Sequence, residues 1–354
     1  MSGEKRNRRD FLKQAGGAVA GVAGISLLGT SCTARERHAA AGIASGPARN
    51  VSRVSAPVDN PIVVIARDES IWRDDKLDAD RVQALLFKAM RALSGASSDE
   101  DAWSQFFRDD DRVAVKVNCL SGRRLSTTPE LVSGLVAGLG AARVPMANIA
   151  VFDRTTDELK NAGFEINTDQ NSLKILGTDT DGVGYENELS VNGEAGSCVS
   201  RIVTRFSTAL INASVLKDHD LAGVSGCLKN WFGAIHNPNK MHENGCDPYV
   251  ADVAGLPEFR DRARLFVCDG TLAQYEAGPG YKGAYAWKFS GLLVGNNPVA
   301  VDAVAHDIIA KKRAEKGLPS LEEEDRPVRY LASAAERGLG TADLSQITIK
   351  EISL

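Results

Sequence analysis

The chain has few cysteines, and no two of them form a C-x-x-C pair. They stand at scattered positions: Cys32, Cys119, Cys198, Cys227, Cys246 and Cys268. A disulfide scaffold, a cysteine-only zinc site and an iron–sulfur cluster all need clustered or regularly spaced cysteines. We therefore do not expect an iron–sulfur cluster within this chain, whereas one or two isolated disulfides stay open.

Other familiar signatures are also missing. The sequence contains neither a P-loop ending in Gly-Lys nor an H-E-x-x-H zinc motif, which gives little support to nucleotide binding or zinc-protease chemistry. It is acidic, with a formal net charge of −4, and it has no basic stripe, so nucleic-acid binding is not expected. The 43% hydrophobic and 25% charged residues are ordinary for a folded globular domain.

The N-terminal residues have a different composition. The run from Arg8 to Lys13 (RRDFLK) is a twin-arginine pattern, and a mildly apolar, glycine-rich run from Ala15 to Gly29 follows it. That run is shorter than the roughly 20 residues that span a bilayer. We therefore interpret residues 1–41 as a twin-arginine signal peptide, in preference to a membrane anchor or a basic arm before a helix.

This interpretation predicts where the protein works. We expect the twin-arginine translocation machinery to export it to the bacterial periplasm or cell envelope, with cleavage near Ala41 and no transmembrane span in the mature protein. Lipid attachment at Cys32 is the less favoured alternative. Residues 1–41 carry seven Lys/Arg and three Asp/Glu, so their removal changes the net charge from −4 to −8. Because this route carries folded proteins, often with a bound cofactor, it favours a cofactor without identifying one.

The remainder predicts an α/β fold with a mainly parallel sheet flanked by helices. Residues 42–60 are small and polar, typical of a linker, and residues 61–354 are expected to form a single domain. A strand over 112–117, a helix that starts near Thr128-Pro129 and a strand over 149–152 form a βαβ unit, which implies parallel pairing. Short β-rich pieces over 173–206, with a turn at Asn192-Gly193, predict an inserted antiparallel ribbon.

Further elements follow from apolar periodicity and from turn residues. The strands are expected over 61–66, 210–216, 264–268, 291–294 and 347–352, and the helices over 80–93, 103–107, 299–310 and 329–337.

The segment from Lys217 to His242 is the most distinctive part of the chain. It reads KDHDLAGVSGCLKNWFGAIHNPNKMH and holds three of the five histidines directly after an apolar strand. Three other strands also end in polar residues: one in Lys116 and Asn118, one in Asp153 and Arg154, and one in Asp269. Ligands of open parallel sheets bind outside the carboxyl ends of the strands, so we expect one site there.

The candidate residues have two alternative uses. Lysines and a capped helix start near Thr128 favour a carboxylate or phosphate. For this reading the ligand-binding candidates are Lys116, Asn118, Asn230 and Asp269, and the catalytic candidates are His219, Lys217 and Lys229, with His219 as the acid/base. The rival is a metal ion held by His219, His236 and His242. Asp302 and His306, four residues apart, are interpreted as a helix-surface pair.

Three separate runs resemble the domain of unknown function 362 family. They are KVNCLSG…STTPELV at 116–132, the run 217–233 with its S-G-x-x-K-N-x-x-G pattern, and CDG…GLLVGNNPVAVDAVA at 268–305. The resemblance covers most of residues 60–310 and implies a bacterial or archaeal α/β protein without an assigned reaction. Relatives often carry a four-cysteine ferredoxin module, which suggests redox surroundings, but this chain lacks the module.

Two functions are consistent with these patterns. The first is an exported enzyme, redox or metal-assisted, with a site for a small anionic molecule at the carboxyl edge of the sheet. The second is a non-catalytic periplasmic protein that binds a ligand or assists a redox partner.

Overall fold

The computed structural model describes residue 42 and residues 60–354, so the predicted signal peptide and nearly all of the predicted linker lie outside the described residues. The main sheet has the strand order β14-β1-β13-β11-β9-β4-β5-β6, with β10 and β12 paired to β9 and β11. Its pairs are parallel except those of β13, β10 and β12. The predicted α/β class, with a mainly parallel sheet between helices, is confirmed.

The strands of the structure have the following bounds: β1 Ile62–Arg67, β2 Trp72–Arg73, β3 Lys76–Leu77, β4 Val113–Lys116, β5 Ile149–Asp153, β6 Lys174–Gly177, β7 Ser190–Asn192, β8 Ala195–Ser197, β9 Ala209–His219, β10 Gly223–Ser225, β11 Ala263–Gln274, β12 Ala286–Trp287, β13 Gly291–Gly295 and β14 Thr348–Ile352. The α-helices are α3 Ala79–Ser94, α4 Asp99–Ser104, α5 Pro129–Ala141, α6 Thr156–Ala162, α7 Cys227–Asn230, α8 Tyr249–Ala254, α9 Pro257–Arg260, α10 Pro298–Glu315 and α11 Tyr330–Glu336.

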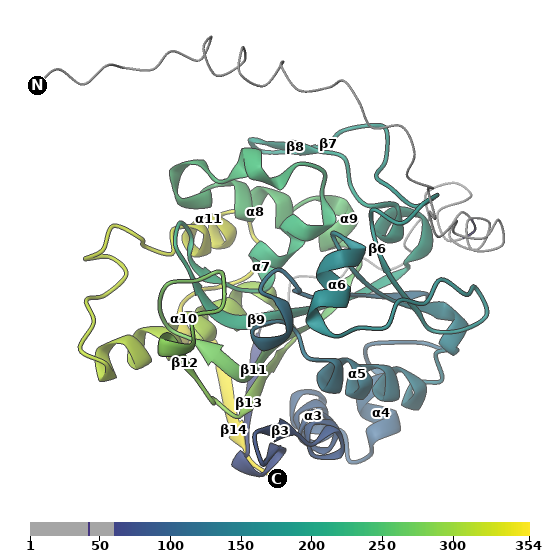
Figure 1. Ribbon diagram of the computed structural model, residues 1–354, viewed down its shortest axis with the longest axis horizontal. Helices are drawn as coiled ribbons and strands as arrows, with labels where there is room; N and C mark the ends of the chain where they lie inside the picture. The colour runs from purple at the N-terminus through teal and green to yellow at the C-terminus, as the bar shows by residue number, and fades with distance from the viewer. Residues whose placement is uncertain (1–41, 43–59) are drawn as a thin grey trace, which may run out of the picture. The chain divides into compact units, whose positions relative to one another are not determined.

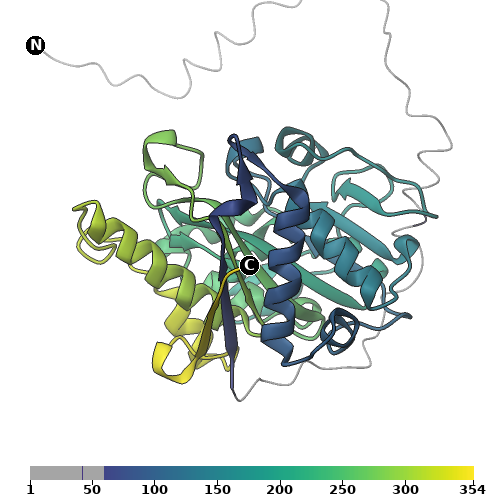
Figure 2. The same cartoon turned by 90° about the horizontal axis from the view of Figure 1, so that it is seen from below.

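Helices cover both faces of the sheet, and each face has its own apolar core (Figure 1). Side chains of α3 to α6 pack on one face against strand residues such as Val64, Val115 and Ile211. Those of α7 to α11 pack on the other face against alternate residues, among them Val63 and Ala114. The alternation follows from the two-residue period of a strand. Figure 2 shows the long helices α3 and α10 on opposite sides of β1.

Local sequence signals account for most of these elements. In α3 the predicted apolar positions are all buried: Val82, Leu85, Leu86, Ala89, Met90 and Leu93. Helix α5 has Thr128 as its N-cap and Pro129 in its first turn, and it joins the neighbouring parallel strands β4 and β5, which confirms the βαβ unit. The helix predicted over 103–107 instead spans residues 99–104, because Ser98 caps its start.

The predicted ribbon is smaller than expected. Strands β7 and β8 pair antiparallel around a turn at Gly193-Glu194, one residue beyond the predicted Asn192-Gly193. Residues 174–177, however, form β6, which pairs parallel with β5 at the edge of the main sheet. Residues 202–206 form a π-helical turn rather than a strand. The predicted segment thus contains one sheet strand, one short hairpin and one helical turn.

Two general features concern the whole described region. None of its helices combines the length and the apolar character needed to cross a membrane. The five cysteines from Cys119 to Cys268 are all free, and four of them are buried. The disulfides left open by the sequence are therefore not formed among these five residues.

Candidate anion-binding site

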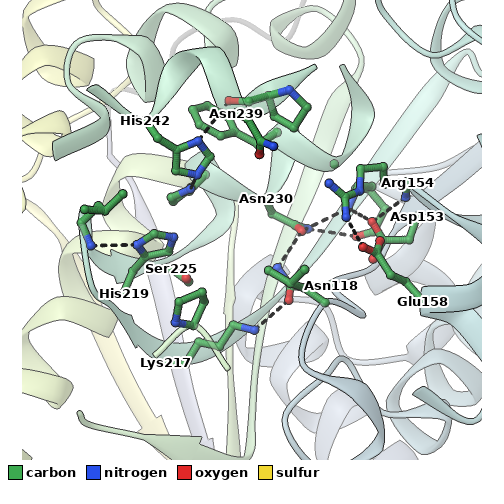
Figure 3. A pocket seen from close by; sticks show the side chains of 18 of the residues that line it. Asn118, Asp153, Arg154, Glu158, Lys217, His219, Ser225, Asn230, Asn239 and His242 are labelled. Atoms are coloured by element: carbon green, nitrogen blue, oxygen red, sulfur yellow. Dashed lines mark hydrogen bonds and ion pairs between the residues drawn. The ribbon is translucent and has the colours of Figure 1, made fainter. Parts of the chain in front are cut away.

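A cavity of about 320 Å³ opens at the carboxyl ends of β4, β5 and β9 (Figure 3). Its walls come from these strand ends, from α7 and from the loop before His242, and Pro279 contributes a further edge. Seven of the sequence-predicted residues line it: Lys116, Asn118, Lys217, His219, Lys229, Asn230 and His242. The site thus lies at the sheet edge where ligands of open parallel sheets bind.

Strand β9 runs past its apolar part and presents two site residues. It continues to His219 because β10 folds back on it, with Lys217 opposite Ser225 and His219 opposite Gly223. Residues two apart in a strand share a face, so Lys217 and His219 both point to the cavity. Asp218 points the other way and accepts the N–H of Gly278 at 2.8 Å.

Helix α7 is held by a carboxylate from another helix. Asp302 of α10 accepts the backbone N–H groups of Cys227 at 2.6 Å and Leu228 at 3.0 Å. Burial raises the pKa of Asp302 to about 7, although both hydrogen bonds act in the opposite direction. Asp302 is fully buried, so its interpretation as one of a surface pair was wrong. It fixes the short helix that carries Lys229 and Asn230.

A hydrogen-bond network joins three of the walls. Lys116 Nζ donates to Asp153 Oδ1 at 2.6 Å and to Asn230 Oδ1 at 3.2 Å. Asn118 donates to the same Asn230 oxygen at 3.2 Å and accepts from Lys217 Nζ at 3.0 Å. Figure 3 shows this chain of dashed lines from Lys217 to Asp153. The network fixes the amides and ammonium groups relative to each other before any ligand arrives.

Lys217 and Lys229 differ from Lys116 in having no carboxylate partner. Only 1% of Lys217 and 8% of Lys229 is exposed, and neither side chain forms an ion pair within the described residues. Burial lowers the pKa of each to about 8, since an ammonium loses its hydration there. Two buried, uncompensated cations therefore face one cavity.

The two histidines of the cavity are held in defined orientations. Nδ1 of His219 accepts the N–H groups of Leu221 at 3.1 Å and Ala222 at 3.3 Å, so the proton of the neutral ring is on Nε2. Burial and the nearby cations Lys229 and Lys217 keep the pKa of His219 far below its usual range. The ring is therefore a neutral donor, although the exposed Asp220 carboxylate lies 2.9 Å from Nδ1.

The ring of His242 lies beside that of His219, with the centroids 6.0 Å apart. Its Nδ1 lies 3.1 Å from the carbonyl oxygen of Pro238, an acceptor only, so Nδ1 carries the proton. Its Nε2 is then free to accept and lies 3.1 Å from Lys229 Nζ. His242 is thus the hydrogen-bond partner of one of the two unpaired lysines.

Asp269 does not line the cavity. Its carboxylate accepts four hydrogen bonds, from the backbone N–H and the hydroxyl of Thr128 and from the same groups of Thr271, at 2.8 to 3.0 Å. The helix start near Thr128, predicted to bind an external anion, is therefore already occupied by a carboxylate of the protein. Its role in the structure is to join β11 to the start of α5.

The three histidines predicted to bind a metal do not converge. His236 is exposed, does not line the cavity, and packs its ring edge-on against Tyr185 at 5.3 Å between centroids. Across the part of the chain that the structure describes, no group of three or more His, Cys, Asp or Glu side chains is placed to hold a metal ion. The polar groups that face the cavity are therefore mainly ammonium groups, amides and two imidazoles.

Several residues of the site were not among the sequence candidates. Asp153 anchors Lys116, and Arg154 and Glu158 form an ion pair on the opposite side of the cavity from His219 and His242 (Figure 3). The run 278–283 (GPGYKG) has the G-x-G-x-x-G spacing of a dinucleotide site, but it lies between β11 and β12 and leads only into the short 3₁₀ helix Gly283–Tyr285 rather than into an α-helix. Asp153 and Arg154 stand at the end of an apolar strand, and this position was the sequence signal that could have identified them as site residues.

The elements that line the cavity also match a known protein family. A family model described as Domain of unknown function (DUF362) matches residues 113–307, a little over half of the chain. The matched region includes every element that lines the cavity. No curated protein matches the chain.

Proposed function

The chain belongs to the domain of unknown function 362 family, and we propose that its cavity binds a small anionic molecule as an exported enzyme or binding protein. The observation that carries this proposal is the pair of buried ammonium groups, Lys217 and Lys229, that face the cavity without a carboxylate partner. A buried cation is costly unless a counter-charge compensates it. An anionic ligand supplies that charge.

The cavity also fits such a ligand in size and in polar groups. Its volume of about 320 Å³ is at the lower end of small-molecule sites, which suits a short carboxylate or phosphate. Lys217 and Lys229 supply charge, and His219 supplies a neutral N–H donor. Asn118, Asn230 and Lys116 position these groups through the network described above.

Binding is tested with the purified chain and simple anions. We expect phosphate, oxalate or malonate to raise the melting temperature, and we expect Lys217→Met and Lys229→Met to abolish that rise. Lys240→Met is the matched control, because Lys240 is exposed in the same segment and does not line the cavity. If these anions leave the wild-type melting temperature unchanged, or if the control variant loses the effect equally, the proposal is wrong.

We extend the proposal to location. The twin-arginine pattern at Arg8-Arg9 supports export by the twin-arginine machinery to the periplasm or cell envelope. A fusion of residues 1–60 to a reporter should be exported from a bacterial host, and changing both arginines to lysine should retain it in the cytoplasm. A second fusion with Cys32→Ser separates cleavage near Ala41 from lipid attachment, because only a lipid-anchored product would change its fractionation.

A further inference from the structure

Resting on the proposed function, we infer that the anion is a 2-oxo acid whose carbonyl carbon forms an imine with Lys229. The two unpaired lysines of the cavity have different surroundings. One is surrounded by hydrogen-bond acceptors, and the other contacts a group that can take its proton. A site with one fixed cation and one reactive amine suits a molecule that carries a carboxylate next to a carbonyl.

Lys217 is the fixed cation. Its Nζ lies 3.0 Å from Asn118 Oδ1, 2.7 Å from Ser121 Oγ and 3.4 Å from the carbonyl oxygen of Leu125. An ammonium has three N–H donors and no lone pair, so these neighbours hold its charged form in one orientation. It can attract a carboxylate, but its nitrogen is not free to attack a carbon.

Lys229 has different surroundings. Among the described residues its Nζ has a single hydrogen-bond partner, Nε2 of His242, at 3.1 Å. The same nitrogen lies 4.4 Å from the ring centroid of Phe232, which covers one side of it. Since burial lowers the pKa of Lys229 to about 8, the neutral amine is accessible near neutral pH.

His242 can receive and return the proton. Its Nδ1–H donates to the carbonyl oxygen of Pro238, so its Nε2 lone pair points at Lys229. The edge contact with Phe232, at 5.5 Å between centroids, helps to fix the ring. His219, on the same side of the cavity in Figure 3, can donate its Nε2–H to a carbonyl oxygen.

The step balances without an outside reactant. The ammonium of Lys229 passes one proton to Nε2 of His242, and the freed lone pair forms a bond to the carbonyl carbon. A second proton moves from the nitrogen to the former carbonyl oxygen, which gives a carbinolamine. His242 then returns its proton to that hydroxyl, the carbon–oxygen bond breaks, and water departs. The product is a protonated imine, which has the same total charge as the starting ammonium and carbonyl groups.

Reductive trapping of the full chain tests this inference. The protein is incubated with pyruvate and sodium cyanoborohydride, and the modified lysines are located by peptide mass spectrometry. We expect modification at Lys229 to exceed that at the exposed Lys240 by roughly two orders of magnitude, because a pKa of about 8 leaves Lys229 far more neutral amine than the reference value for lysine would. Lactate, which has the carboxylate but a hydroxyl in place of the keto group, should protect Lys229 from pyruvate.

Variants assign the roles of the two lysines. The Lys229→Met variant should show no modification in the cavity. The Lys217→Met variant should still be modified at Lys229, but it should need more pyruvate to reach the same extent of labelling. The wild-type map alone is decisive if either variant fails to fold. Labelling of Lys229 no greater than that of Lys240 would overturn the imine. If pyruvate and lactate then still raise the melting temperature through Lys217, anion binding stands; if neither does, both proposals fail.

Discussion

The carboxylate of Asp302 caps the helix that begins at Cys227, 75 residues earlier in the chain, by accepting two of its backbone N–H groups. Gly226 precedes that helix, and a Cβ at this position would collide with the same carboxylate. The glycine and the aspartate are therefore required together. Their contact sets the position of Lys229 and Asn230, which lie within one turn of the cap.

We predict that Asp302→Asn destabilises the protein by about 1–3 kcal/mol, because the new amide group would face a backbone donor and leave it unpaired. The melting temperature and a urea titration measure this effect. Anion affinity should fall as well, since α7 loses its anchor. Asp78→Asn is the control: Asp78 caps α3 near the surface, and asparagine is an equally good N-cap. Equal losses in both variants would contradict the special role of Asp302.

A second prediction concerns Gly233, where the chain passes close to a buried ion pair. A Cβ at this position would lie 2.6 Å from Lys116 Nζ and 2.8 Å from Asp153 Oδ1. Gly233→Ala should therefore separate these groups, cost about 1–3 kcal/mol of unfolding free energy and weaken anion binding. Calorimetry of unfolding and of ligand binding would show both effects.

The control for Gly233 is a glycine that, unlike Gly233, has open space where a Cβ would lie. Gly140 lies in α5, and a Cβ there would have no neighbour within 4 Å. Gly140→Ala should stabilise the protein by about 0.5–1 kcal/mol, because alanine favours the helix. A Gly233→Ala variant as stable as Gly140→Ala would show that the ion pair tolerates the extra methyl group.

The fold was predictable where local patterns determine it. The helical spacing from Val82 to Leu93 and the cap at Thr128 located α3 and α5. The direction of β13 was not predictable, because an apolar run of five residues looks the same in a parallel or antiparallel pair. Residues 174–177 were assigned to the antiparallel ribbon for a related reason: the sequence of β6 is too short to indicate which strand it pairs with.

The site was predictable to the extent that it consists of strand ends. Lys116 and Lys217 follow apolar strands, and the parallel sheet brings them to one edge. Asp269 also follows an apolar strand, yet it is held by Thr128 rather than directed into the cavity. Asp302 was misjudged because its partner, the start of α7, is distant in the sequence. Whether such a carboxylate lines the cavity or binds another element depends on contacts between elements that are distant in the sequence, and the periodicity of the sequence does not indicate these contacts.

The buried lysines predict opposite effects of pH on the stability of the free protein and on the additional stabilisation that an anion provides. In the folded chain Lys217 and Lys229 lose their protons near pH 8, whereas in the unfolded chain they keep them up to about 10.5. Without ligand, the free energy of unfolding should therefore rise between these pH values, because the unfolded state binds more protons. The stabilisation by an anion should fall over the same range, since the anion binds the ammonium form.

Melting temperatures at pH 7 and pH 9.5, with and without malonate, measure both trends. The relevant quantity is the difference in melting temperature between the wild type and Lys217→Met. Other groups that titrate in the same pH range contribute equally to both proteins, so their effect cancels in this difference. In the variant the rise without ligand should be smaller and the effect of malonate absent at either pH. An anion effect that grows from pH 7 to pH 9.5 would contradict the role of the ammonium groups.

The last prediction separates a structural carboxylate from a ligand-binding one. Asp269 accepts four hydrogen bonds from Thr128 and Thr271 and does not line the cavity. Asp269→Asn should therefore cost about 1–3 kcal/mol of unfolding free energy and leave the dissociation constant for malonate unchanged. Asp343→Asn is the matched control, because Asp343 makes the same two bonds to the residue two positions on, Ser345, but is exposed to water. A stable Asp269→Asn protein that no longer binds malonate would contradict the structural role and show that Asp269 takes part in ligand binding.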